Sequence, residues 1–263
     1  MSQSGPVPTG SAPDDWNHHW NEYAESASLN PAQRYRHHLI ERALERTGPV
    51  TRLLDIGSGQ GDLLAILATV WPDADLAGVE LSAAGIEHAR AKLPGVRFVE
   101  RDLLVPASPP PGLERWATHA VCSEVLEHVD APVDLLENVR AFLAPGATLV
   151  VTVPGGPRSA FDRHIGHRRH YTAAQLGELL RSAGFACDFV HRAGFPFFQL
   201  YRLVVILRGK RLVDDVAVSP DGAASPAAAA LMRAFDWLFR ANLDHAPWGW
   251  QLVAGARVID RSE

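Results

Sequence analysis

The chain has 263 residues, enough for one large domain, and its 47% hydrophobic and 21% charged residues are those of an ordinary globular protein. A formal net charge of −5, with no block of like charge, argues against a nucleic-acid partner. No apolar run reaches the roughly 20 residues that span a bilayer, so we expect no transmembrane segment. The two cysteines, Cys122 and Cys187, form no metal or redox motif and favour a reducing, cytoplasmic location.

The N-terminal region predicts a leader followed by helical structure. Residues 1–15 lack the basic start and apolar core of a signal peptide, and we expect them to be disordered. Asn30 and Pro31 supply an N-cap and a first-turn proline for a helix that ends near residue 46. We expect a single domain over residues 16–263.

Apolar runs of strand length alternate with helical segments through the middle of the chain. Near-continuous apolar strands separated by helices indicate a parallel sheet covered on both faces, and hence an α/β fold. The expected strands are 52–56, 75–80, 96–100, 119–123, 148–153, 185–191 and 250–259. The expected helices are 62–70, 82–93, 132–143, one that starts at a capping box of Thr172 and Gln175, and 231–243.

The stretch LLDIGSGQGDLL (53–64) places a glycine-rich loop between an expected strand and an expected helix. Its glycines follow G-x-G-x-G, whereas a dinucleotide loop follows G-x-G-x-x-G, and no Lys-Ser/Thr pair completes a Walker motif. Such a loop brings backbone amides close to a ligand. Asp55, at the end of the strand, suits a cationic ligand better than a pyrophosphate, which a carboxylate repels.

Acidic residues also end the next two expected strands. Glu80 can accept both hydroxyl protons of a ribose diol, because its carboxylate offers two oxygens at a fixed separation. Asp102 can accept from the exocyclic amine of adenine, while Leu103 packs on the face of the base. Together with Asp55, these positions fit an adenosine with a cationic, amino-acid-like tail, which describes S-adenosylmethionine.

The series LLDIGSGQG…VELS…ERDLL, within roughly 50–190, resembles the motifs of class I S-adenosylmethionine-dependent methyltransferases, closest to the ubiquinone-biosynthesis O-methyltransferase-like group. The resemblance implies a Rossmann-like fold, with a seven-stranded, mostly parallel sheet, helices on both faces and a last antiparallel strand. It implies S-adenosylmethionine as the cofactor. The expected cofactor-binding residues are Arg36, Asp55, Gly57, Ser58, Gly59, Glu80, Leu81, Asp102, Leu103 and Ser123.

Two segments outside the core pattern take their roles from the same resemblance. The stretch NPAQRYR is similar to the arginine-bearing helix of the quinone-pathway enzymes, where an arginine binds the cofactor carboxylate. Arg34 and Arg36 are both candidates, and Arg36 is favoured. The resemblance implies a helical lid over residues 16–47 and a helical insertion over residues 194–245 before the last strand.

The stretch HAVCSEVLEHV (119–129) resembles the end of the fourth strand in the same group. A helical turn here would place Glu124, Glu127 and His128 on one side. Three alternatives remain open: His128 acts as a general base, the three side chains hold a divalent cation such as Mg²⁺, or they stabilise the turn. We favour the base and assign no metal.

The stretch GGPRSAFDRHIGHRRHYT (155–172) carries His164, His167 and His170 among several arginines. Zinc is not expected, because no cysteine or acid stands at ligand spacing and the arginines would repel a cation. Many class I methyltransferases have a similar segment that closes over the acceptor. We expect His164 or His167 to assist His128 and an arginine to face an anionic group; the alternative is a solvated basic loop.

The predicted reaction is methyl transfer to a small-molecule acceptor, most simply a hydroxyl, by direct in-line attack. The alternative is an S-adenosylmethionine-binding enzyme of the same fold that catalyses a non-methylation reaction such as cyclisation. Residues 195–212 combine apolar and basic side chains, and fit a wall for a hydrophobic acceptor, a homodimer contact, an extra core helix or peripheral contact with a membrane. The Ala- and Arg-rich composition suggests bacterial secondary or glycan metabolism.

Overall fold

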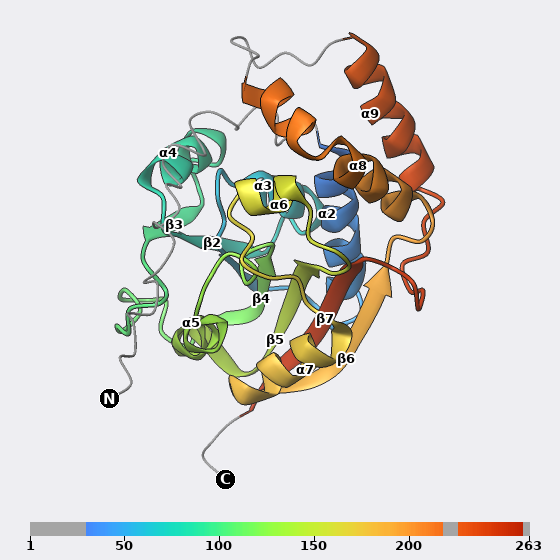
Figure 1. Cartoon of the computed structure of the whole chain (residues 1–263). Helices are drawn as coiled ribbons and strands as arrows, with labels where there is room; N and C mark the ends of the chain where they lie inside the picture. The colour runs from blue at the N-terminus through green and yellow to red at the C-terminus, as the bar shows by residue number, and fades with distance from the viewer. Residues whose placement is uncertain (1–29, 218–225, 260–263) are drawn as a thin grey trace, which may run out of the picture.

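The computed structural model describes residues 30–217 and 226–259, so the expected leader and the first part of the expected lid lie outside the described residues. Seven strands form one sheet in the order β3-β2-β1-β4-β5-β7-β6 (Figure 1). The strands are β1 Arg52–Ile56, β2 Asp75–Glu80, β3 Arg97–Glu100, β4 Ala117–Ser123, β5 Leu143–Pro154, β6 Phe185–Ala193 and β7 Gln251–Val258. β7 runs antiparallel to both β5 and β6, as expected for the last strand.

Helices cover both faces of this sheet. They are α2 Pro31–Leu44, α3 Asp62–Val70, α4 Ala83–Lys92, α5 Pro132–Val139, α6 Ala160–His164, α7 Ala173–Ser182, α8 Phe197–Ala217 and α9 Pro226–Phe239. Asn30 caps α2 by accepting from the amide of Ala32, and Thr172 and Gln175 form the expected capping box of α7. No helix in the described part of the chain is long and apolar enough to cross a membrane.

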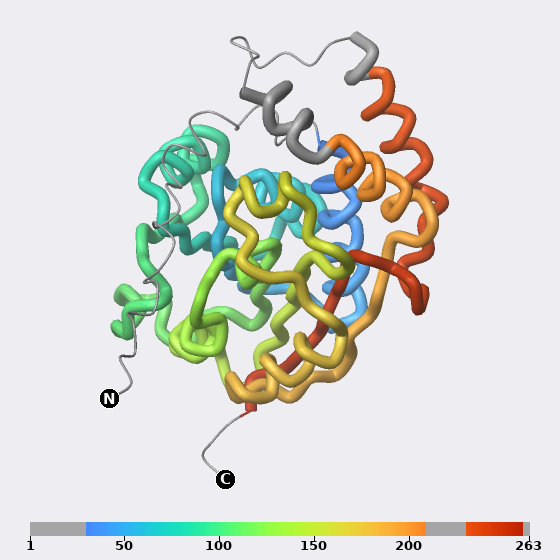
Figure 2. The backbone as a smooth tube through the Cα atoms, viewed as in Figure 1, coloured from blue at the N-terminus to red at the C-terminus, as the bar shows by residue number. Residues whose placement is uncertain are grey.

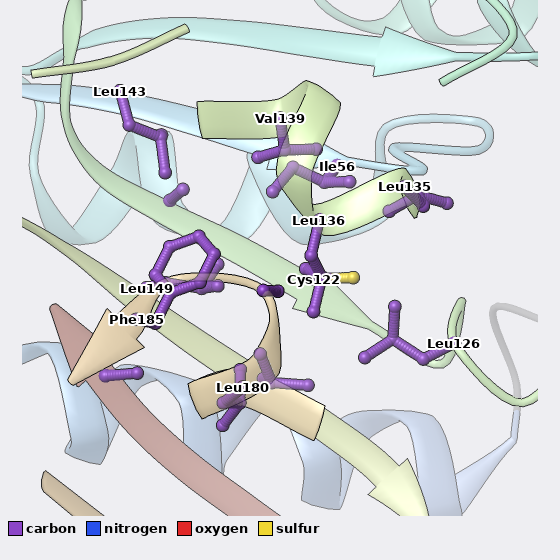
Figure 3. Close-up of a cluster of buried hydrophobic side chains, with 14 of the residues drawn as sticks. Ile56, Cys122, Leu126, Leu135, Leu136, Val139, Leu143, Leu149, Leu180 and Phe185 are labelled. Carbon is purple, nitrogen blue, oxygen red and sulfur yellow. The ribbon is translucent and has the colours of Figure 1, made fainter. Parts of the chain in front are cut away.

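One face of the sheet packs against α5 and α7 (Figure 3). The buried side chains labelled there are Ile56, Cys122, Leu126, Leu135, Leu136, Val139, Leu143, Leu149, Leu180 and Phe185. Cys122 is fully buried in this layer, and burial raises the pKa of its thiol well above the ordinary value. Packing on this face therefore fixes the end of β4, from which the loop with Glu127 and His128 departs.

On the opposite face, α8 and α9 lie side by side next to α2 (Figure 2). Their aromatic rings meet with centroids 5.3–5.9 Å apart, and the rings are those of Tyr35, Phe198, Tyr201, Phe235 and Phe239. The aromatic side of α8 is therefore part of the core. Its outer side exposes Leu200, Leu203 and Leu207. The acceptor-wall, dimer and membrane interpretations of this segment now concern that outer side, and they stay predictions.

The segment expected as an insertion, 194–245, starts and ends at neighbouring points. The amide of Gly194 donates to the carbonyl of Leu243 at 3.0 Å, and the amide of Leu243 donates to the carbonyl of Phe195 at 2.8 Å. α8 and α9 thus extend from a hydrogen-bonded base between the antiparallel strands β6 and β7.

Candidate functional site

The loop between β1 and α3 is built from glycines that no other residue replaces easily. Gly57, Gly59 and Gly61 have φ values of +71°, +51° and +79°, in the left-handed region that favours glycine. A Cβ on Gly57 would lie 2.4 Å from Cγ2 of Val125. The glycine loop therefore packs directly on the loop that follows β4.

Glu80 holds this glycine loop from the end of β2. Its Oε2 accepts from the amide of Gly59 at 2.8 Å, and its Oε1 accepts from the amides of Leu81 and Ser82 at 2.9 and 2.8 Å. A carboxylate has about four acceptor positions, so these three amides leave one position, on Oε2, for a ribose hydroxyl. The Leu81 side chain is 50% exposed beside it.

Asp55 and Ser58 are two buried polar residues at the expected cofactor end of the site. Burial, and next the charge of Glu80, raise the pKa of Asp55 to about 7. A ligand cation beside Asp55 would favour its charged form again. The hydroxyl of Ser58 is buried without a hydrogen-bond partner among the residues that the structure describes. These two groups fit the cationic tail of S-adenosylmethionine better than they fit a pyrophosphate.

The remaining expected cofactor contacts lie at the ends of β3 and β4. Asp102 is exposed and accepts from the amide of Leu104 at 2.8 Å, while the Leu103 side chain beside it is buried. The hydroxyl of Ser123 shares a 2.8 Å hydrogen bond with that of Thr152. All three stand at the carboxyl edge of the sheet, and their contact with a cofactor stays a prediction.

α2 presents Arg36, rather than Arg34, to the site. Arg34 pairs with Asp236 of α9 at 2.9 Å on the surface, whereas Nη1 of Arg36 lies 3.7 Å from Oε2 of Glu124. Gln251, at the start of β7, donates to Oε1 of Glu124 at 2.9 Å and is fully buried. Nothing in the sequence near Gln251 pointed to this role, because its partner is 127 positions away.

The predicted helical turn over residues 124–128 is wrong. Glu124 has a φ of +56°, and the residues after it form a tight turn in which the amide of His128 donates to the carbonyl of Val125. Glu124 therefore turns toward Arg36 and Gln251, and it does not share a face with Glu127 and His128. Instead Glu127, His128 and His167 each offer one ligand atom, and these atoms lie within 4.8 Å of one another.

Glu127 is the most unusual carboxyl group of this site. It is fully buried, and neither oxygen has a hydrogen-bond partner among the described residues. Burial, and next the charge of Glu124, raise its pKa well above the ordinary range, which favours the protonated form. A neutral carboxyl beside two imidazoles can exchange a proton with them, and the same three groups could hold a divalent cation.

The segment 155–172 folds down onto the loop with Glu127. The amide of Arg168 donates to the carbonyl of Glu127 at 2.8 Å, and the Tyr171 hydroxyl donates to the carbonyl of Leu126 at 2.9 Å. This brings His167 into the site, while His164 stays exposed at the end of α6. The structure thus joins His167 to His128, and a catalytic role for His164 stays a prediction.

The reason given above against zinc in the segment 155–172 is wrong, because an acid is present. Asp162, His167 and His170 offer ligand atoms within 4.8 Å of one another. Arg202 of α8, next to α6 in Figure 1, donates to both Asp162 oxygens at 2.8 and 2.7 Å. Burial raises the pKa of Asp162, but Arg202 outweighs burial and holds it below its usual range. Arg202, which the sequence did not single out, is the cation that opposes a metal here.

His37 lies on the buried face of α2, and it predicts an acid-sensitive fold. Burial, and next the charge of Arg36, lower its pKa to about 4. In the unfolded chain His37 takes up a proton below about pH 6.5, whereas in the folded protein it stays neutral down to about pH 4. The fold therefore keeps its full free energy of unfolding above about pH 6.5 and loses part of it as the pH falls toward 4. We expect urea unfolding to show a loss of about 3 kcal/mol from this residue, absent in His37→Gln. The exposed His88→Gln exchange should keep the wild-type loss, and an equal loss in both variants would contradict the assignment.

A comparison with protein families identifies the domain. The profile of a family described as "Methyltransferase domain" matches residues 28–189, more than half of the chain. The chain belongs to this methyltransferase domain family. The predicted S-adenosylmethionine-dependent methyltransferase class is thereby confirmed at the level of the family.

Relatives of this methyltransferase domain carry a different name from the one that the motifs suggested. The chain is 31% identical over 137 residues to trans-aconitate 2-methyltransferase of Paracidovorax citrulli. The aligned region covers 52% of this chain and 51% of that protein. The chain spans about half the length of the curated relatives it matches. The narrower resemblance to the ubiquinone-pathway group is therefore replaced by the methyltransferase domain family as a whole.

Solved structures share the fold of this methyltransferase domain. The [4+2]-cyclase SpnF has a TM-score of 0.60 at 19% identity and covers 97% of this chain and 99% of its own. Phosphoethanolamine N-methyltransferase 2 of Haemonchus contortus, in complex with S-adenosyl-L-methionine, has a TM-score of 0.51 at 18% identity. The match covers 82% of this chain and 51% of that one. At these identities the likeness confirms the Rossmann-like class I methyltransferase fold and nothing finer.

Proposed function

We propose that this methyltransferase domain transfers the methyl group of S-adenosylmethionine to a hydroxyl group of a small molecule. The observation that carries the proposal is the buried group of Glu127, His128 and His167, which adjoins the glycine loop through the contact of Val125 with Gly57. This contact supports a position of the proton acceptors beside the proposed cofactor end of the sheet. S-adenosylmethionine would supply an activated methyl group there, so that the protein contributes mainly alignment and proton uptake.

Different residues of the chain would bind different parts of the cofactor. The amides of the glycine loop and Oε2 of Glu80 would bind the ribose, and Asp102 and Leu103 the adenine. Asp55 would face the ammonium group of the tail, and Arg36 its carboxylate. Arg36 lies beside the carboxylate of Glu124 in this structure. When the cofactor binds, Arg36 would either leave Glu124 for the cofactor carboxylate or contact both carboxylates.

A hydroxyl acceptor fits this site better than a carboxylate acceptor, such as the one in the relatives' name. A carboxylate is already an anion and needs cations, whereas a hydroxyl needs a base. The arginines around the histidines are engaged by protein groups: Arg202 by Asp162, Arg168 by Asp130, and Arg158 by the carbonyl of His167. The groups at the centre are instead imidazoles and the carboxyl of Glu127, whose pKa is raised by burial. His128 is therefore the proposed base and His167 its helper, since burial, and next the charge of His128, lower the pKa of His167.

Location and further partners complete the proposal. The free cysteines Cys122 and Cys187 support a reducing, cytoplasmic location. The exposed leucines on the outer side of α8 support contact with a hydrophobic acceptor, a second copy or a membrane surface. Bacterial secondary or glycan metabolism is supported by composition alone.

Labelled methyl transfer tests the proposed reaction. We would incubate the protein with methyl-labelled S-adenosylmethionine and either a panel of small phenols and sugar alcohols headed by catechol, or trans-aconitate as the carboxylate probe. We expect label in a hydroxyl probe and none in trans-aconitate. His128→Ala and His167→Ala should lower turnover by about 100-fold, because they remove a base, and the exposed His88→Ala exchange should not.

Three outcomes would redirect the proposal. Label in trans-aconitate with unchanged turnover of His128→Ala would contradict both the acceptor class and the base. Activity that a chelator abolishes and Mg²⁺ restores would assign Glu127, His128 and His167 to a metal. Calorimetry that shows S-adenosylmethionine binding, without transfer to any probe, would favour the alternative of a non-methylation reaction such as cyclisation.

A further inference from the structure

A chain of three histidines runs from a backbone carbonyl to Glu127. Nδ1 of His170 lies 3.2 Å from the carbonyl oxygen of Gly156, and Nε2 of His170 lies 3.1 Å from Nδ1 of His167. The ring of His167 then meets the ring of His128 edge to face, with centroids 4.7 Å apart. His167 also offers a ligand atom within 4.8 Å of a carboxyl oxygen of Glu127.

The partners along this chain decide which nitrogen of each ring carries a proton. A carbonyl oxygen only accepts hydrogen bonds, so Nδ1 of His170 donates to Gly156. In a neutral imidazole the other nitrogen is an acceptor, so Nε2 of His170 accepts from Nδ1–H of His167. Nε2 of His167 therefore keeps its lone pair, and it is the ring nitrogen that is not bonded to His170.

This assignment requires a neutral His170, and the groups around its ring favour that state. The His170 side chain is 5% exposed, and burial lowers its pKa. Asp162, with Oδ2 at 3.9 Å from Nε2 of His170, acts in the opposite direction and raises the pKa. The hydrogen bond to the Gly156 carbonyl and, more weakly, the charge of Glu124 also raise it, but burial outweighs them. Arg202 occupies both oxygens of Asp162 and adds its own positive charge near the ring. Arg202 thus keeps Asp162 from drawing a second proton onto His170.

We propose that His170 is a positioning residue that holds His167 in the Nδ1–H tautomer and so leaves a lone pair on Nε2, in the ring that meets His128 and adjoins Glu127. The use of that lone pair for a hydroxyl proton rests on the proposed function, but the tautomer does not. An unconstrained neutral histidine favours the Nε2–H tautomer. Without His170, Nε2 of His167 would carry a proton and could not take up another.

Nitrogen NMR of the full-length protein, labelled with ¹⁵N-histidine, tests this inference. The chemical shifts of the two ring nitrogens distinguish the tautomers, and the signals of His167 are assigned by their loss in His167→Gln. His170→Leu removes both hydrogen bonds of the chain. His170→Gln is the matched variant, because its side-chain oxygen can accept from His167 and its amide can donate to Gly156.

We expect His167 to carry its proton on Nδ1 in the wild type and in His170→Gln, and mainly on Nε2 in His170→Leu. A wild-type His167 that is protonated on Nε2 or on both nitrogens would overturn the inference, as would an unchanged tautomer in His170→Leu. If His170→Leu does not fold, the wild-type and His170→Gln spectra decide. The measurement needs no turnover, so a failure of the proposed methyl transfer and a failure of this inference give different results.

Discussion

Replacing Arg202 with methionine is expected to lower the free energy of unfolding by about 3–5 kcal/mol, because it leaves the carboxylate of Asp162 buried without its counter-charge. The Asp162 side chain is 1% exposed and that of Arg202 is 13% exposed. Burial alone raises the pKa of Asp162, so the carboxyl group in the variant must take up a proton or admit water. Urea unfolding at pH 7 measures the loss, and in a domain of this size it corresponds to a decrease in Tm on the order of 10 °C.

A surface pair that is also bidentate provides the control. Arg257 donates to both oxygens of Asp188, yet its side chain is 60% exposed. Arg257→Met should therefore leave unfolding unchanged within error. The double variant Asp162→Asn, Arg202→Met should recover part of the loss, since no charge stays buried. Equal losses in Arg202→Met and Arg257→Met, or no loss in the former, would show that burial does not make this pair important.

Gly57→Ala is expected to weaken binding of S-adenosylmethionine by 10-fold or more, about 1.4 kcal/mol or more. The new Cβ would stand 2.4 Å from Cγ2 of Val125, and the backbone φ of +71° strains any residue other than glycine. Relief of the clash has to displace either the glycine loop or the loop that follows β4. Both loops adjoin the proposed binding site, so calorimetry with S-adenosylmethionine and its demethylated product should record the change.

Gly48→Ala is the control that separates the effect of the Cβ clash from the effect of the positive φ. It has a φ of +96°, but an added Cβ would meet nothing within 4 Å. Gly48→Ala should therefore lose about 1 kcal/mol of stability and leave the cofactor Kd unchanged. If Gly57→Ala binds the cofactor as the wild type does, the glycine loop does not form the cofactor site. Thermal unfolding of both variants shows whether each is folded under the binding conditions.

The sheet and its cofactor edge could be predicted from the sequence because short-range patterns determine them. The bounds of β1 and β2 agree with the expected 52–56 and 75–80, and α3 spans the expected 62–70. Hydrophobic periodicity, a glycine loop and a capping box each act within a few residues. The expected helix 132–143 ends at Val139 instead and continues as a short 3-10 helix, because β5 already begins at Leu143. Such end effects depend on the tertiary pairing of the strands.

The acceptor end of the site could not be predicted to the same extent, because its partners are far apart in the chain. His164, His167 and His170 stand three positions apart in the sequence, but α6 ends at His164 and the chain then turns. His167 and His170 meet through a direct hydrogen bond instead. The charge balance depends on Arg202, which is 40 positions from Asp162, and no local pattern connects the two.

The hydrogen-bonded base between Gly194 and Leu243 has a consequence for the evolution and engineering of this enzyme. A segment whose ends meet can be exchanged for a longer or shorter one without moving the strands on either side. The boundaries at which this segment could be exchanged for that of another protein are therefore Gly194 and Leu243. One cross-link breaks this modularity, because Arg202 leaves with the segment while Asp162 stays behind. A donor segment without an arginine at that place must be accompanied by a change of Asp162, so the two are expected to vary together.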